Sequence, residues 1–141
     1  MDAANAEAGV RYLLGTMTNA FPDAMVDCSY YAHMIPTMPN DEKDRHVLAA
    51  AIASKADVLV TANLKDFRVP AGFCYTEVQH PDDFLHYQLE IAPQEFFHAL
   101  EDLASNRRKP MNSVPGILTS LQKTVPNFAS QAQTMLPDYL P

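Results

Sequence analysis

Glycine and cysteine are scarce in this 141-residue sequence, and long apolar runs are missing. The four glycines are not grouped, so the sequence contains no glycine-rich phosphate-binding loop. Two cysteines, Cys28 and Cys74, cannot form a disulfide framework, and we expect a reduced, cytoplasmic chain. No apolar run approaches the roughly 18 residues that a membrane helix needs. The first residues also lack the basic leader and apolar core of a signal peptide.

Basic residues are outnumbered, with 10 Lys and Arg against 17 Asp and Glu, which gives a formal net charge of -7. This balance argues against non-specific binding to DNA or to anionic lipid. It leaves open a nuclease whose bound cations reverse the local field. Five dispersed histidines and the lack of a cysteine pair at zinc spacing leave no zinc motif. The length fits one domain, or a domain with a short appendage, and the 48% hydrophobic content is enough for a folded core.

The first part of the chain, up to about residue 80, alternates between helical and strand patterns. An apolar stripe at helical spacing predicts an opening helix that Pro22 ends. Its members are Val10, Leu13, Leu14, Met17 and Phe21. Residues 24–28 fit a short strand, and residues 30–40, which contain two prolines, fit a loop.

The segment from residue 43 to residue 78 carries the strongest α/β pattern. A helix over about residues 43–55 is apolar on nearly every face and is expected to be buried. Residues 57–61 contain an unbroken apolar run, residues 58–60, with two valines, which is typical of a parallel strand covered on both faces. Residues 74–78 predict a weaker strand at a sheet edge. Helix followed closely by strand indicates an α/β fold.

The second part, about residues 81–141, is predicted to be all helical. Pro81, Pro93, Pro115 and Pro126 stand where first helical residues belong. Apolar residues then recur on one face of each later helix. These are Phe96, Phe97, Leu100, Leu103, Ile117, Leu118, Leu121, Phe128, Ala132, Met135 and Leu136.

Carboxylates are the candidate chemical groups. Asp41, Glu42 and Asp44 lie at the start of the buried helix, and Asp66 follows the strong strand. Ligands of open α/β sheets bind beyond the carboxyl ends of the strands, where both sets can converge. Carboxylate oxygens there would suit Mg²⁺ or Mn²⁺. Alternatively, Asp44 is a helix cap and Asp66 is a turn residue.

Two segments carry a resemblance to a known family. Residues 40–53 read NDEKDRHVLAAAIA, and residues 56–67 read ADVLVTANLKDF. Together they resemble a PIN domain of the VapC type, the ribonuclease toxins of toxin–antitoxin pairs. Residues 77–85 are similar to the stretch that closes such domains. The resemblance spans residues 7–90, and the helical tail is more weakly similar to the C-terminal segment of longer VapC-type proteins.

The resemblance implies a PIN-like three-layer α/β/α fold with a parallel sheet in residues 1–90 and a helical extension in residues 91–141. It implies a metal-dependent endoribonuclease that cleaves RNA phosphodiesters with Mg²⁺ or Mn²⁺. Asp44 and Asp66 match acids of the family, with Thr61 and Asn63 as polar neighbours. The cationic run of Arg107, Arg108 and Lys109 could contact RNA phosphates, or it could be a solvated helix end.

Two family features have no match in this sequence, namely the central first strand that ends in an acid and an early helical Glu. We therefore expect an N-terminally incomplete sheet, self-association and weak metal binding, since unpaired strand edges invite association. Glu7, Asp27 and Asp41 are the first substitutes for the missing acids. The alternative function is a non-catalytic PIN remnant or interaction module that binds an antitoxin-like protein.

Overall fold

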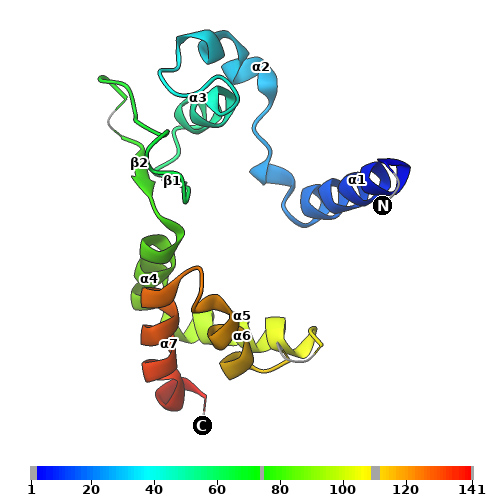
Figure 1. Ribbon diagram of the computed structural model, residues 1–141, viewed down its shortest axis with the longest axis vertical. Helices are drawn as coiled ribbons and strands as arrows, with labels where there is room; N and C mark the ends of the chain where they lie inside the picture. The colour runs from blue at the N-terminus through cyan, green and yellow to red at the C-terminus, as the bar shows by residue number, and fades with distance from the viewer. Residues whose placement is uncertain (1–2, 74, 109–111, 141) are drawn as a thin grey trace. The chain divides into compact units, whose positions relative to one another are not determined.

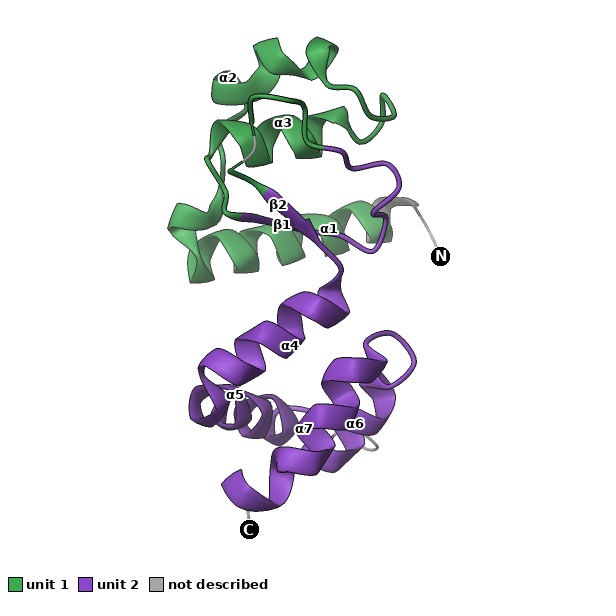
Figure 2. Cartoon of the chain, turned by 90° about the vertical axis from the view of Figure 1, so that its left-hand side faces the viewer, with its two compact units in different colours: residues 1–57, 69–76 green, residues 58–68, 77–141 purple. Residues whose placement is uncertain are grey.

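The computed structural model describes residues 3–73, 75–108 and 112–140 (Figure 1). The chain divides into two compact units, coloured separately in Figure 2. Unit 1 contains Met1–Asp57 and Val69–Thr76, and unit 2 contains Val58–Arg68 and Glu77–Pro141. Within the described ranges no helix is both long enough and apolar enough to cross a membrane.

Unit 1 is built around α3 (Arg45–Ala53), the helix predicted from its apolar centre. The expected burial of nearly every face was wrong, because Val47 on the opposite side is 36% exposed. The short helices α2 (Cys28–Tyr31) and η2 (Ala32–Thr37) pack against α3. Leu48, Ala49 and Ile52 are the buried residues of α3, because they share one face of the helix. The segment that returns from unit 2 is fixed to the end of this helix. In that segment the Tyr75 hydroxyl donates to the Ile52 carbonyl oxygen over 3.0 Å.

The opening helix α1 (Ala3–Ala20) has the predicted extent, and η1 (Pro22–Ala24) begins at Pro22. Its apolar stripe, however, lies exposed. Val10, Leu13, Leu14, Met17 and Phe21 are 53–65% exposed. Helix periodicity predicts which side of a helix is apolar, but it does not determine whether another element covers that side.

Two local predictions in unit 1 were wrong. The strand expected over residues 24–28 is absent from the structure, which has irregular backbone there followed by α2. The cause is Asp27, whose Oδ1 accepts a hydrogen bond of 2.8 Å from the Ser29 backbone N–H and so caps α2. The loop expected over residues 30–40 is largely helical, because η2 accommodates Pro36 in a 3₁₀ turn.

The sheet consists of two parallel strands, β1 (Val58–Val60) and β2 (Glu77–Gln79), both in unit 2. Val58 pairs with Glu77, and Val60 pairs with Gln79. The parallel β1 confirms the strand predicted at residues 57–61, whereas the expected burial on both faces was wrong. Val60 is 39% exposed, because each strand of a two-stranded sheet is an edge and few side chains cover it. The predicted strand at residues 74–78 is found at β2, and Cys74 lies outside the described residues.

The remainder of unit 2 is helical, as predicted, so the described chain is mostly helical with a small parallel sheet. The helices are α4 (Pro81–Ile91), α5 (Pro93–Ser105), α6 (Val114–Leu121) and α7 (Pro126–Tyr139). Pro81, Pro93 and Pro126 begin their helices, and Pro115 is the second residue of α6. Each helix contributes to one apolar core. Its described members are Leu89, Phe97, Leu100, Ala104, Val114, Ile117, Leu118, Val125, Phe128, Ala129 and Ala132.

A buried carboxylate connects two of these helices, which lie side by side (Figure 1). Asp82, only 5% exposed, accepts hydrogen bonds from the backbone N–H groups of Asn127 and Phe128 at 3.1 and 2.8 Å. The N-cap residue of α7, Val125, has no side chain that could accept these bonds. Asp82 of α4 therefore caps α7 from 45 residues away along the chain.

Candidate functional site

The loop after β1 brings three of the predicted site residues together. The Thr61 N–H donates to the Gln79 carbonyl oxygen over 2.9 Å, so this residue still belongs to the paired edge of the sheet. The Asn63 N–H donates to Thr61 Oγ1 at 3.1 Å. The Asn63 amide Nδ2 donates to Asp66 Oδ2 at 2.7 Å. The loop thus folds back on itself at the carboxyl end of β1, the edge at which the sequence placed a site.

The Asp66 carboxylate is held in place by this loop. Its backbone N–H donates to the Asn63 carbonyl oxygen, and the neighbouring Phe67 is buried, so the loop is anchored on both sides of Asp66. Asp66 itself is exposed. With one oxygen held by Asn63, the other carboxylate oxygen remains available for a water, a cation or another polar ligand.

Asp44 occupies the N-cap position of α3, but its side chain makes no capping hydrogen bond. The neighbouring Asp41 supports this turn instead. Its carbonyl oxygen accepts from the Asp44 N–H at 2.9 Å, and its Oδ1 accepts from the Lys43 N–H at 3.2 Å. The structure therefore does not support the helix-cap explanation for Asp44. Its half-buried carboxylate accepts no hydrogen bond from the first turn of α3.

The donor chemistry is suited to a hard cation, but the ligand set is incomplete. Thr61, Asn63 and Asp66 offer a hydroxyl, an amide and one carboxylate, all oxygen donors of the kind that Mg²⁺ and Mn²⁺ accept. Asp44 belongs to unit 1, whereas this loop belongs to unit 2. Among the described residues, no group of three or more His, Cys, Asp or Glu side chains gathers as a metal site would require.

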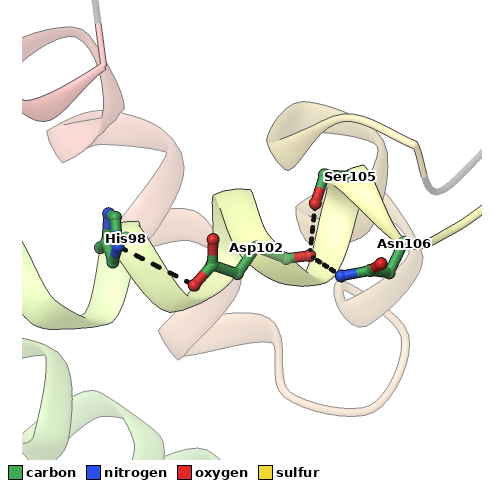
Figure 3. A network of polar contacts seen from close by, with 4 residues as sticks. All are labelled: His98, Asp102, Ser105 and Asn106. Carbon is green, nitrogen blue, oxygen red and sulfur yellow. Dashed lines mark hydrogen bonds and ion pairs between the residues drawn. The ribbon is translucent and has the colours of Figure 1, made fainter.

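The predicted cationic run follows the C-terminus of α5. Figure 3 shows how that helix ends, with Ser105 Oγ and Asn106 Nδ2 each donating to the Asp102 carbonyl oxygen at 2.8 Å. Arg107 and Arg108 come next and are exposed, and Lys109 lies outside the described residues. Cations stabilise the C-terminus of a helix whether or not RNA is bound. The exposed arginines therefore fit both an RNA contact and a solvated helix end.

One unusual residue near Asp44 in the chain has no counterpart among the sequence-based predictions. Asn40 is buried, and both polar atoms of its amide lack a hydrogen-bond partner within the described structure. Its backbone carbonyl oxygen accepts a 3.0 Å bond from Arg45 Nε, which fixes the chain just before α3. Burial of this amide depends on how the segment folds against α3, and no local pattern predicts it.

Comparisons with known proteins identify the family. The model of the VapC50 C-terminal domain matches residues 81–134, the region of α4 to α7. Over 112 residues the chain is 37% identical to the Mycobacterium tuberculosis (strain ATCC 25618 / H37Rv) protein named "Putative ribonuclease VapC50". The alignment covers 79% of this chain and 66% of that relative, just under two thirds of its length. No solved structure matches the chain.

The chain is therefore a homologue of the VapC-type protein VapC50, and it carries the VapC50 C-terminal domain. The resemblance carried by residues 40–67 is confirmed as homology to VapC50. The helical tail, which showed the weaker similarity in the sequence, is the part that the family model matches.

Proposed function

We propose that the chain is a metal-dependent endoribonuclease of the VapC type that cleaves RNA phosphodiesters. The observation that carries the proposal is the homology to a protein named as a ribonuclease, together with the Thr61–Asn63–Asp66 loop at the carboxyl end of β1. The proposal includes a PIN-like three-layer α/β/α arrangement, of which β1 and β2 are the parallel strands.

Asp44 and Asp66 are the proposed catalytic and metal-binding carboxylates, with Mg²⁺ or Mn²⁺ as the cation. Thr61 and Asn63 would hold Asp66 in one orientation, as their hydrogen bonds support. These two carboxylates are fewer than the acids that a PIN nuclease gathers around its metal. We therefore propose that they bind the cation, and we assign them no role in a particular step of the cleavage. Arg107, Arg108 and Lys109 are proposed to contact RNA phosphates.

The domain division is also a proposal. The sequence predicted a boundary between residues 90 and 91. The VapC50 C-terminal match begins at residue 81, and Asp82 connects α4 to α7. These two observations favour a boundary at His80, with α4 belonging to the helical domain. An antitoxin-like protein and a second copy of the chain are proposed as partners, and the cytoplasm as the location.

A cleavage assay tests the catalytic proposal. The chain is incubated with a fluorescently labelled RNA and Mg²⁺ or Mn²⁺, beside Asp44→Asn, Asp66→Asn and the control Asp57→Asn, an exposed aspartate just before β1. We expect metal-dependent cleavage to fall by about 100-fold or more in the first two variants and to be unchanged in the control. Cleavage that survives both substitutions would contradict the assignment.

One observation favours the alternative, a non-catalytic interaction module. The apolar stripe of α1 is exposed over five residues, and surfaces of this kind bind proteins. This alternative predicts no metal-dependent cleavage by the unmodified chain, with retained binding of a protein partner. The unmodified chain in the same assay therefore separates the two functions.

A further inference from the structure

An open cavity of about 460 Å³ lies between α4 and α7, away from the loop of Asp66 and inside the region matched by the VapC50 C-terminal domain. Every described residue that lines it is polar or carries a polar tip. They are Asp83, His86, Tyr87, Asn127 and Ser130. The cavity is large enough for a long side chain.

The cavity lies close to the N-terminus of α7, where an anion would ordinarily bind. Here the position is already taken, because the Asp82 carboxylate accepts from the N–H groups of Asn127 and Phe128. The adjacent Asp83 adds a second carboxylate, and its side chain forms no ion pair or hydrogen bond with the described residues. Two neighbouring carboxylates make the cavity unfavourable for a phosphate and favourable for a cation.

The remaining lining groups favour a cation with several N–H donors. Glu90 Oε1 lies 3.4 Å from His86 Nε2, so a further carboxylate stands beside the histidine that lines the cavity. His86 Nδ1 is buried and is not open to a ligand. The Asn127 side chain brings an oxygen acceptor, and Ser130 Oγ, which already accepts from Gln122 Nε2 at 2.9 Å, has a second lone pair. The half-exposed Tyr87 offers an aromatic face on which a cation can stack.

We propose that this cavity binds the guanidinium group of an arginine side chain presented by a protein partner. A guanidinium is planar and carries five N–H donors, which suits the Asp83 carboxylate and the further oxygen acceptors of Asn127 and Ser130. An ammonium group has three donors and no flat face for stacking on Tyr87. The proposal is independent of the nuclease activity, because no residue of the Asp66 loop takes part.

The test is a ¹H–¹⁵N NMR titration of the full chain with N-acetyl-argininamide. We expect shifts confined to residues 83–87 and 127–130, with a dissociation constant on the order of millimolar for a lone side chain. Asp83→Asn should weaken binding about tenfold through the lost charge-assisted bonds. Tyr87→Leu should weaken it about threefold through the lost cation–π contact.

The matched controls lie outside the cavity. Asp102→Asn removes the same charge from an exposed aspartate on α5, whose Oδ2 lies 3.8 Å from His98 Nε2 (Figure 3). Tyr12→Leu removes an exposed tyrosine from α1. Both controls should bind N-acetyl-argininamide as the unmodified chain does, and circular dichroism checks that every variant is folded.

Several outcomes would overturn the proposal. They are an absence of shifts, shifts that persist in Asp83→Asn, equal shifts with N-acetyl-lysinamide or spermidine, and preferential shifts with adenosine monophosphate. Shifts of the same residues on concentrating the chain alone would assign the cavity to a second copy instead of a different partner.

Discussion

The helices of unit 2 enclose a core, whereas the opening helix of unit 1 does not. α5 buries Phe97, Leu100 and Ala104, while the comparable apolar stripe on α1 lies exposed. Both helices have an apolar side at the same spacing. They differ in what lies opposite, because α4, α6 and α7 cover α5, while α1 packs with the η1 turn that follows it.

The contrast shows how little an amphipathic helix contributes alone, because most helical stability in proteins comes from packing of the apolar face. The matched family domain coincides with the region that has a closed core. We therefore expect unit 2 to dominate the measured stability, and the stripe of α1 to affect association.

The largest effect is expected from the core of unit 2. Phe128→Ala should lower the free energy of unfolding by about 3–5 kcal/mol, because it removes a fully buried ring from the middle of the core. Phe21→Ala removes the same side chain from the exposed stripe and should change stability by no more than about 0.5 kcal/mol. Urea unfolding followed by circular dichroism measures both. Equal losses would show that the stripe of α1 is covered in solution.

The second prediction concerns the long-range cap of α7. Asp82→Ala should cost about 2–3 kcal/mol, because it leaves the Asn127 and Phe128 N–H groups without their charged acceptor. Asp83→Ala, one position later and exposed, should cost less than about 0.5 kcal/mol. The same unfolding experiment compares them. A small effect of Asp82→Ala would mean that water replaces the carboxylate.

The third prediction concerns association through α1. Leu14→Glu combined with Met17→Glu should reduce self-association, because it places charge within the exposed stripe, and should leave the unfolding curve nearly unchanged. Light scattering at several protein concentrations measures the effect. Ile91→Glu, which places the same charge at an exposed apolar residue of α4, serves as the control. A monomer at every concentration, with or without the substitutions, would exclude association through this helix.

The smallest effect is expected at Asp27. Hydrogen bonds that its carboxylate accepts from Ser29 hold the pKa of this carboxyl below its ordinary value of 3.8. Because the folded pKa is lowered, the stabilisation is present above the unfolded pKa and is lost as the pH falls through the folded pKa. Asp27→Asn should therefore lower stability slightly at pH 7, where the charged carboxylate is lost, and should have no effect at pH values below the folded pKa. Thermal unfolding from pH 2 to pH 7 measures it, with Asp23→Asn as control.

Much of the fold could be predicted from local chemistry. Proline cannot continue a helix from within but fits its first turn, so Pro81, Pro93 and Pro126 mark helix starts wherever the helices pack. The apolar runs likewise predicted α3 and the parallel β1. The loop of Thr61, Asn63 and Asp66 follows from its position after a strand, since its hydrogen bonds join residues two or three apart.

Other features depend on residues far apart in the chain, and no local pattern contains them. The role of Asp82 requires a backbone 45 residues away, so its carboxylate could not be distinguished from its neighbour Asp83 before the helices were packed. The exposure of Val60 and of the α1 stripe is decided by which elements cover them. Periodicity determines which side of an element is apolar because side-chain direction is set within one turn of backbone. Burial is a property of two surfaces in contact, and only the tertiary structure brings the second surface into place.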